Sequence, residues 1–584
     1  MSNLFSLKSI KNKPHRDGFD LSFSNTMTAP LGALVPCMFK DVMPGDKFKI
    51  NTSWFTRSQP CTAPAYSKFT EYVDFFFVPY HFLWRYFPDF IAQANNNNFA
   101  DNVQTVNAPS FTQHPYFTEL GFTNYLNRIL GLVTIDQDAE VLSKRSGLDL
   151  FGLTNGSEVY RVYGIKRLFE YLGYGNIRLI KSNPPSTGET NYFKAQVGLH
   201  SETMNPFPLL AYNKIYNDFY RNSQWEEAIP RNFNVDYLTP FGSSMEMPIS
   251  GMMPYPNNND SFYLDTMFDL KYCNYNKDMF TGCLPNKQYG SSALASPLLA
   301  PNGNLAVASA QKVKYFDSEG AFYVPALAVT DNNSARNLGI SALAIRQAEF
   351  LQKWKEITQS GGTDYVSQME KHFGVKPNSD IAHRCQYLGG ITKNFGADEV
   401  VNTNLTGDNE ANIMGKCVNT GNGSLSFSSN EHGIIMGIYH ISLLPSYDAS
   451  CDRLLFKTTP TDYVIPELDN IGMQPIYRNE VQMTKNSKIM GYVPRYSEYK
   501  SSVDIINGAF VDTYKNWVTP ITSNFKGDVN SGALSYANFK VCPLTLNNLF
   551  NVLYDGSYET DQFFVNLAFD IKAVRNISRD GLPF

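Results

Sequence analysis

The most restrictive feature of this sequence is a period of two near its C-terminus. Between residues 563 and 573, every second side chain is apolar, in the order Phe563, Val565, Leu567, Phe569, Ile571 and Ala573. Asn566, Asp570 and Lys572 occupy the opposite face. Because successive side chains of a strand point to opposite faces of its sheet, this pattern predicts a long strand with one buried face. We expect this strand to cover residues 561–576.

Similar patterns occur far from this strand in the sequence. Between residues 28 and 78, prolines and glycine punctuate short apolar runs, which is typical of strands joined by turns. Residues 73–78 (VDFFFV) are apolar on both faces, as a strand inside a sandwich is. Residues 433–444 alternate again, with one face formed by Ile435, Tyr439, Ile441 and Leu443. Strands near both ends of the chain, separated by large insertions, predict one β-sandwich or jelly roll.

The segments between these strands differ in composition. Residues 81–234 have mixed periodicity, and we interpret them as an insertion with helices. Residues 235–335 are rich in Pro, Asn, Gly and Ser, which is typical of surface loops, so they are the candidate surface protrusion. A helical segment is expected over 336–380, with its main helix at 341–358. That helix has an apolar stripe of the kind that usually packs in a core: Leu343, Phe350, Leu351, Trp354 and Ile357.

Composition and charge limit the function classes. Aromatic residues make up 14% of the chain and charged residues only 18%, against about 25% charged in average proteins. Such a surface suits contact with neighbours, although a β-rich enzyme or a carbohydrate-binding protein can share it. The net charge of −5 provides no overall attraction for nucleic acid. The eight scattered cysteines predict neither a disulfide framework nor a zinc site. Without a signal peptide or membrane-length apolar run, we expect synthesis in a reducing cytoplasm.

Motifs of the common enzyme classes are missing. The sequence has no phosphate-binding loop, no GxSxG elbow and no HExxH motif. His440 lies in a strand pattern, where a structural histidine is more frequent than a ligand or base. Glu226 and Glu227 beside Trp225 imitate the acid pair of a glycosidase, but carboxylates are too common for this match to be specific. We therefore expect no catalytic, cofactor-binding or metal site.

Two groups of residues are better suited to binding. The first combines a basic N-terminal arm, residues 1–20, with basic residues after the last strand. Its DNA-contact candidates are Lys8, Lys11, Lys13, Arg16, Lys572, Arg575 and Arg579. The second is Gly491–Lys500 (GYVPRYSEYK), whose cations and rings can stack on single-stranded nucleic acid or clamp a neighbouring subunit. Its candidates are Tyr492, Arg495, Tyr496, Tyr499 and Lys500.

Several blocks resemble one known family. They are Phe5–Leu7 with Gly18–Ser22, Leu34–Pro36 with Asp41–Asp46, Phe75–Pro79 with Leu83-Trp84, Ile345–Ala348 with Gly361–Thr363 and His372–Val375, Tyr387–Gly390, and Gly491–Lys500. In order and spacing these blocks resemble the major capsid proteins of microviruses, especially the gokushovirus-like and alpavirus-like branches of these single-stranded DNA bacteriophages. The resemblance covers most of the chain and leaves mainly residues 100–330 unmatched.

The resemblance implies an eight-stranded antiparallel jelly roll with large mixed helical and loop insertions. Residues 21–80 are then its first strands, and residues 381–584 supply the remaining strands and loops. It further implies a T=1 icosahedral shell around circular single-stranded DNA, assembled in the bacterial cytoplasm, with a surface insertion that contacts the host. The implied partners are the chain itself, the genome, an internal scaffolding protein, a small basic DNA-binding protein, a minor pilot protein and a host receptor.

Two questions remain open at this point, namely the role of Gly491–Lys500 and the function class of the chain. In a shell protein, Glu498 beside Arg495 favours an internally paired segment that supports the fold or an interface, over DNA stacking. The alternative function is a jelly-roll carbohydrate-binding or glycan-cleaving protein, which needs a secretion route.

Overall fold

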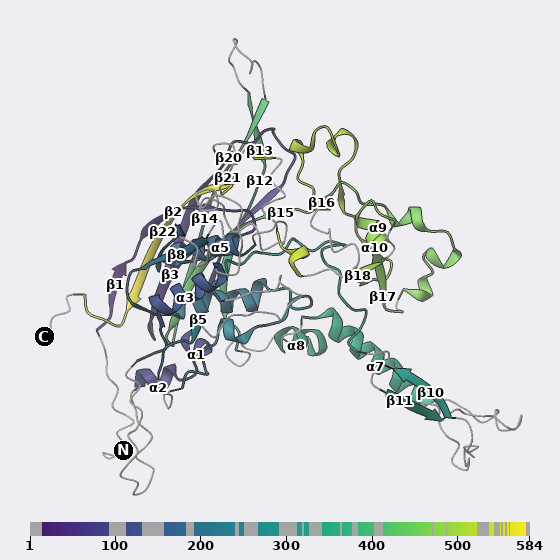
Figure 1. Cartoon of the computed structure of the whole chain (residues 1–584), viewed down its shortest axis with the longest axis horizontal. Helices are drawn as coiled ribbons and strands as arrows, with labels where there is room; N and C mark the ends of the chain where they lie inside the picture. The colour runs from purple at the N-terminus through teal and green to yellow at the C-terminus, as the bar shows by residue number, and fades with distance from the viewer. Residues whose placement is uncertain are drawn as a thin grey trace, which may run out of the picture.

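Two antiparallel sheets lie at the centre of the protein (Figure 1). The computed structural model describes residues 15–92, 113–130, 157–182, 192–239, 244–249, 267–290, 312–317, 320–325, 342–362, 365–375, 383–401, 413–469, 471–485, 488–522, 536–541, 549–550, 553–554, 558–559 and 561–579. The mainly β, antiparallel fold expected from the sequence is confirmed.

The first sheet contains the strand that the period of two predicted. Its strand order is β1 (Asp17–Asp20), β22 (Phe563–Arg575), β4 (Lys47–Ser58), β14 (Ile413–Ser428) and β13 (Ala397–Val401), and β2 (Phe23–Ala29) also pairs with β22. Buried and exposed residues alternate along β22, as expected. β1 is an ordered strand paired with β22, so the predicted N-terminal arm ends before Asp17 instead of at residue 20.

The second sheet is covered on both faces along its two central strands, β5 (Phe69–Pro79) and β15 (Gly433–Leu443). Its strand order is β12 (Gln386–Phe395), β5, β15 and β3 (Val35–Val42). One face packs on the first sheet, where Phe75 meets Phe569 at 6.5 Å and Phe69 meets Phe563 at 5.7 Å between ring centroids. β15 is buried along its whole length, so its alternating pattern does not produce an exposed face.

The insertion after β5 covers the face of the second sheet that points away from the first sheet. Its elements are α1 (Tyr80–Leu83), α2 (Phe87–Ala92), β6 (Phe117–Thr118), α3 (Glu119–Leu130), α5 (Ser157–Leu172), β7 (Gly175–Ser182), β8 (Tyr192–Leu199), β9 (Thr203–Met204), α6 (Phe207–Ile215) and a π-helix, Tyr216–Tyr220. Figure 1 shows these helices beside β3 and β5. Phe219 of the π-helix packs on Phe76 at 4.8 Å, and the Tyr212 hydroxyl donates to the Leu34 carbonyl at 2.9 Å.

The expectation of an exposed insertion at 235–335 is wrong for part of that range. Met267, Phe268, Leu270 and Tyr272 are buried, and the neighbouring backbone pairs with the residues just before β3, with Cys273 N–H donating to the Gly32 carbonyl at 2.8 Å. A short aromatic run inside a polar segment was the missed signal. The hairpin β10 (Lys312–Asp317) and β11 (Gly320–Pro325) lies far from both sheets, beyond α7 (Figure 1).

The predicted helix at 341–358 is present as α7 (Ala342–Ser360), followed by α8 (Tyr365–Phe373). The expectation that its apolar stripe is core is wrong. Phe350 is 67% exposed, Leu351 47% and Trp354 46%. Periodicity shows that apolar side chains share one face of a helix, but it carries no information about what covers that face.

The described residues between 446 and 522 form a lobe outside both sheets (Figure 1). It contains β16 (Ser446–Tyr447) paired with β19 (Asp504–Ile505), β17 (Met473–Tyr477) paired with β18 (Ile489–Pro494), α9 (Arg478–Val481) and α10 (Ser497–Lys500). Short 3₁₀ turns occur at Pro230–Asn232, Arg453–Phe456, Pro460–Asp462, Pro466–Leu468, Gly508–Phe510, Lys515–Trp517 and Tyr536–Phe539, and β20 (Leu553–Tyr554) pairs with β21 (Tyr558–Glu559). Among the described residues, no helix has the length and apolar character needed to span a membrane.

Candidate interaction surfaces

The segment Gly491–Lys500 runs from β18 through a sharp turn into α10. Tyr496 adopts a left-handed backbone conformation with φ 59°, which is unusual for a bulky residue and reverses the chain before α10. Gly491 lies so close to Cys283 that a Cβ would sit 2.6 Å from the sulfur. The next residue, Tyr492, exchanges two backbone hydrogen bonds of 2.8 Å with Leu284. The start of the segment is therefore fixed by its own chain.

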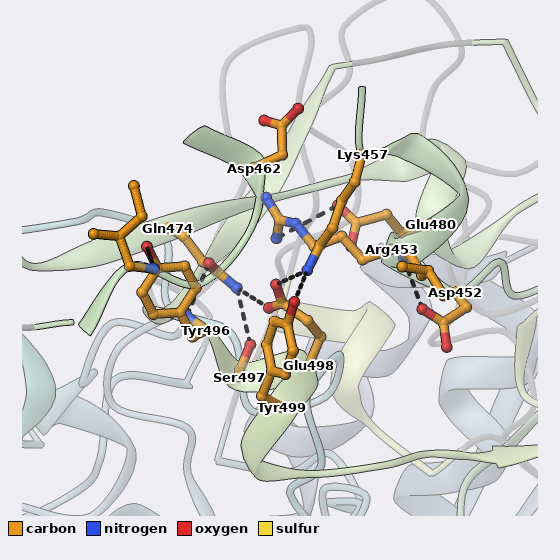
Figure 2. A network of polar contacts seen from close by, with 12 residues as sticks. Asp452, Arg453, Lys457, Asp462, Gln474, Glu480, Tyr496, Ser497, Glu498 and Tyr499 are labelled. Atoms are coloured by element: carbon orange, nitrogen blue, oxygen red, sulfur yellow. Dashed lines mark hydrogen bonds and ion pairs between the residues drawn. The ribbon is translucent and has the colours of Figure 1, made fainter. Parts of the chain in front are cut away.

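Glu498 is the centre of a polar network (Figure 2). Its carboxylate accepts hydrogen bonds from Lys457 at 3.0 Å and from the Gln474 amide at 2.7 Å. Burial opposes ionisation of Glu498, but these hydrogen bonds outweigh it and lower its pKa. Lys457 also donates to the Tyr499 hydroxyl at 3.0 Å. Glu498 is internally paired, as expected, but its partner is Lys457 and not Arg495.

The other candidates of this segment divide between covered and open positions. Tyr496 is only 4% exposed, and its hydroxyl accepts from the Ile465 N–H at 3.2 Å. A buried ring cannot stack on a base, so Tyr496 supports the fold. Arg495 lies over the Tyr496 ring at 5.0 Å. Tyr499 is 56% exposed, and Lys500 forms an open ion pair with Asp469 at 2.7 Å. Tyr499 and Lys500 remain the accessible contact candidates.

Four of the basic candidates come together at one end of the first sheet. Arg16 donates to the Gly45 carbonyl, and Arg575 donates to the Asp41 carbonyl at 2.6 Å. Lys572 pairs with Asp20 at 2.6 Å, and the Arg579 N–H donates to Asp17 at 2.8 Å. Lys8, Lys11 and Lys13 lie outside the described residues.

Carboxylates balance much of this positive charge. Lys572 also lies 3.2 Å from Asp570, and Arg575 lies 3.5 Å from the buried Asp46. The hydrogen bond from Lys572 is the largest cause that lowers the pKa of Asp20 to about 2. Cations that are already paired have less charge to offer to phosphates. This arrangement weakens Lys572 and Arg575 as phosphate ligands on their own.

Two lysines that the sequence reasoning did not select lie on the same sheet face. Lys47 and Lys49 are exposed on β4, and Lys49 lies directly opposite Lys572 on β22. The signal was present in the run Lys47-Phe-Lys-Ile50, where the two lysines share the face opposite to Phe48 and Ile50. Alternation identifies the outward face of a strand, and these lysines belong to it.

Glu226 and His440, which resemble catalytic groups in the sequence, are buried and packed against other side chains. Glu226 is buried, accepts hydrogen bonds from Tyr216 at 2.6 and 2.7 Å, and pairs with Lys540 at 3.1 Å. His440 stacks on Tyr72 at 4.7 Å, and burial lowers its pKa to about 3. In the part of the chain that the structure describes, no three His, Cys, Asp or Glu side chains form a metal-binding group.

Comparison with known proteins places these features in a family. The model of the family described as capsid protein (F protein) matches residues 9–131 and 187–583. Capsid protein VP1 of Chlamydia phage 1 is 23% identical over 92% of this chain and 89% of its own length. Capsid protein VP1 of Bdellovibrio phage phiMH2K is 24% identical over 85% of this chain and 82% of its own length. A VP1 of Spiroplasma virus 4 matches a shorter region, 29% of this chain, at 25% identity.

Proposed function

The chain belongs to this phage capsid protein family, and we propose that its copies assemble into a T=1 icosahedral shell around circular single-stranded DNA. Members of the family are structural proteins of the virion, and a capsid forms by self-association. The proposal therefore requires contact surfaces that are open in the single chain and covered in the shell. The exposed apolar stripe of α7 carries this proposal.

The stripe of α7 is an unusual surface for an isolated chain. Phe350, Leu351 and Trp354 are all about half exposed or more, although monomeric proteins rarely expose contiguous apolar patches. The helix is held by its other side, where Gln352 donates to Gln288 at 2.6 Å and Tyr289 N–H donates to the Lys355 carbonyl. Trp354 also stacks on His372 of α8 at 6.0 Å between ring centroids. The helix is therefore held in place, while Phe350 and Leu351 of its apolar face are exposed and available for a second copy.

A substitution on this stripe tests assembly directly. Phe350→Asp should leave the purified chain folded but abolish closed particles in electron microscopy, because a charge cannot be buried at an apolar contact without a partner. Glu349→Lys is the matched control, since it changes charge at the next exposed residue, about 100° around the helix. Particle formation by Phe350→Asp at the normal yield would show that this face is not a subunit contact.

We propose that the basic end of the first sheet contacts the genome without sequence preference. Lys47 and Lys49 add exposed charge beside the partly neutralised Lys572, and the arm residues Lys8, Lys11 and Lys13 are candidates for the same contact. With a net charge of −5, the chain also requires a small basic partner to neutralise most phosphates. We further propose a scaffolding protein and a pilot protein as assembly partners.

The genome contact predicts a defined salt dependence. Replacing Lys47 and Lys49 by Ala should reduce the slope of log affinity for oligodeoxythymidylate against log salt by about 1.4, because each single-strand phosphate contact contributes about 0.7. The control is Lys353→Ala, an exposed lysine on α7. An unchanged slope in the double variant places the DNA contact elsewhere.

The host contact is proposed for the region of β10 and β11, which lies farthest from the sheets (Figure 1). The remaining proposed divisions are the first jelly-roll strands at 21–80, the helical insertion at 81–234 and the helical segment at 336–380. The glycan-binding alternative gains no support from Trp225, whose indole N–H donates to the Cys283 carbonyl at 2.8 Å and whose ring packs on Phe539 at 4.7 Å. A ring held in this way is not an open sugar platform.

A further inference from the structure

A cationic recess lies beside the end of the π-helix, away from the surfaces described above. Its volume is about 380 Å³, and Phe219, Tyr365 and His383 form part of its wall. Its charged lining residues are Lys214, Asp218, Arg221, Lys277 and Arg384. Four cations therefore share the recess with one carboxylate, in a chain whose net charge is negative.

The single carboxylate is already neutralised. Asp218 pairs with Lys214 at 2.9 Å, and both side chains are less than one-tenth exposed. Asp218 also accepts the Cys385 N–H at 2.9 Å, while Lys214 donates to the His383 carbonyl at 2.8 Å. Asp218 and Lys214 therefore form a closed neutral pair. The other three cations receive no compensating charge from it.

Two arginines are anchored in a way that leaves donors available. Arg221 donates through one terminal nitrogen to the Glu226 carbonyl at 2.6 Å, and Arg384 donates through one to the Asp218 carbonyl at 2.8 Å. Arg384 also lies over the Phe219 ring at 4.5 Å. Among the described residues, no carboxylate forms an ion pair with Arg221, Arg384 or Lys277, and the buried Nε atoms of both arginines lack a hydrogen-bond partner.

The C-terminal end of the helix formed by α6 and the π-helix balances only part of this positive charge. The carbonyl groups at a helix C-terminus supply roughly half a negative charge, which cannot balance three cations. The helix itself is also irregular, because Tyr216–Tyr220 forms a π-helix in which the Arg221 N–H donates to the Tyr216 carbonyl, five residues earlier, at 2.9 Å. Single π-helical turns occur frequently at functional sites. Fixed guanidinium groups are the usual means by which proteins hold planar or tetrahedral oxyanions.

A larger cavity adjoins the recess. It measures about 610 Å³ and shares Phe219, Arg221, Ser223, Lys277 and Gly362 with the recess. Its wall also contains the rings of Tyr72, Phe76 and Tyr387. We propose that the recess binds a phosphate group, with Arg221, Arg384 and Lys277 as its ligands and the aromatic cavity as the place for the group that carries the phosphate. The three proposed ligands lie outside α7, so the site can be tested separately from the exposed stripe proposed for shell assembly.

Inorganic phosphate is the probe for the first test. The full-length chain should bind it saturably in isothermal titration, at constant ionic strength with chloride as the competing salt. Arg384→Gln and Lys277→Gln should each weaken binding at least 10-fold, whereas Arg346→Gln, on the exposed surface of α7, should not. Lys277 is exposed and makes no hydrogen bond among the described residues, so its substitution tests binding without disturbing the fold. Absence of saturable binding, or equal binding by Lys277→Gln, overturns the proposal.

Two further probes identify the source of the phosphate. If the phosphate belongs to nucleic acid, oligodeoxythymidylate should displace inorganic phosphate more effectively than glucose 6-phosphate. If it belongs to a phosphorylated sugar, the order should be reversed, and both results support the site. If neither compound displaces inorganic phosphate, the recess binds only the free ion. That result would contradict the role given to the aromatic cavity. Particle formation by the Arg384 and Lys277 variants should be normal, which separates this site from the proposed assembly.

Discussion

The two central sheets bury their strands to different extents, although both are antiparallel and built from similar residues. Along β22 the buried and exposed residues alternate, while β15 buries every residue from Gly433 to Leu443. The difference comes from the insertion after β5, whose helices cover the face of the second sheet that points away from the first. The insertion is therefore a third layer of the core over β5 and β15, whereas β22 and β4 of the first sheet keep an open face for other molecules.

The largest expected effect tests this third layer. Ile438 lies on the covered sheet and is 1% exposed, whereas Phe564 lies on the open face of β22 and is 44% exposed. Ile438→Ala should lower the free energy of unfolding by about 3–4 kcal/mol, through lost burial and a cavity. Phe564→Ala should cost less than about 1 kcal/mol. Urea unfolding of the purified chains measures both, and equal losses would contradict the three-layer description.

A second test addresses a carboxylate between the two sheets. Glu71 of β5 is completely buried and accepts hydrogen bonds from Thr56, Tyr439 and Asn419. Glu71→Gln should cost about 2 kcal/mol, because an NH₂ group replaces one of the two carboxylate oxygens and then faces a donor in place of an acceptor. Asp570→Asn makes the same chemical change on the open face of the first sheet and should cost less than about 0.5 kcal/mol. A comparable shift of both urea midpoints would show that Glu71 does not join the sheets.

The contrast between covered and open positions extends to the ion pairs of the 446–522 lobe. The side chains of Lys457 and Glu498 are 4% and 10% exposed, while those of Lys500 and Asp469 are 52% and 39% exposed. Glu498→Gln should destabilise the chain by about 1–2 kcal/mol, because Lys457 loses its partner where little water reaches it. Asp469→Asn should change stability by less than about 1 kcal/mol. Thermal unfolding of the two variants provides the comparison, and the reverse order would be inconsistent with the network in Figure 2.

The sequence predicted those features that depend on neighbouring residues. The strand at Phe563–Arg575 and the helix at Ala342–Ser360 agree with their expected ranges to within a few residues. Both elements were predicted from a hydrophobic period that neighbouring residues of the sequence reveal. Burial of β5 was predicted for the same reason, since an apolar run on both faces has a local signature.

Features set by distant residues could not be read in this way. The stripe on α7 was expected to be core because periodicity does not report the covering layer, and Met267–Tyr272 were expected at the surface because their polar surroundings hid a short apolar run. Within the candidate sites, the pairing of Glu498 with Lys457 joins residues about forty positions apart, beyond any helical or strand period. Arg495 lies three positions from Glu498 in the sequence and was therefore a natural but incorrect choice of partner.

The smallest expected effect concerns the edge of the open sheet. Among the described strands β1 pairs only with β22, and Lys572 holds it there through Asp20 at 2.6 Å. The pKa of Asp20 is lowered to about 2, against about 3.9 in an unfolded chain. The contribution of Asp20 to stability is therefore complete above about pH 4 and is lost as the pH falls towards 2.

Proteolysis by pepsin, normalised to its rate on a reference peptide, measures this loss. Pepsin should cleave near Phe19 progressively faster as the pH falls from 4 to 2. Asp20→Asn should remove this pH dependence while β15, covered on both faces, stays resistant. A pH profile shared by the two proteins would mean that another contact holds the edge strand in place.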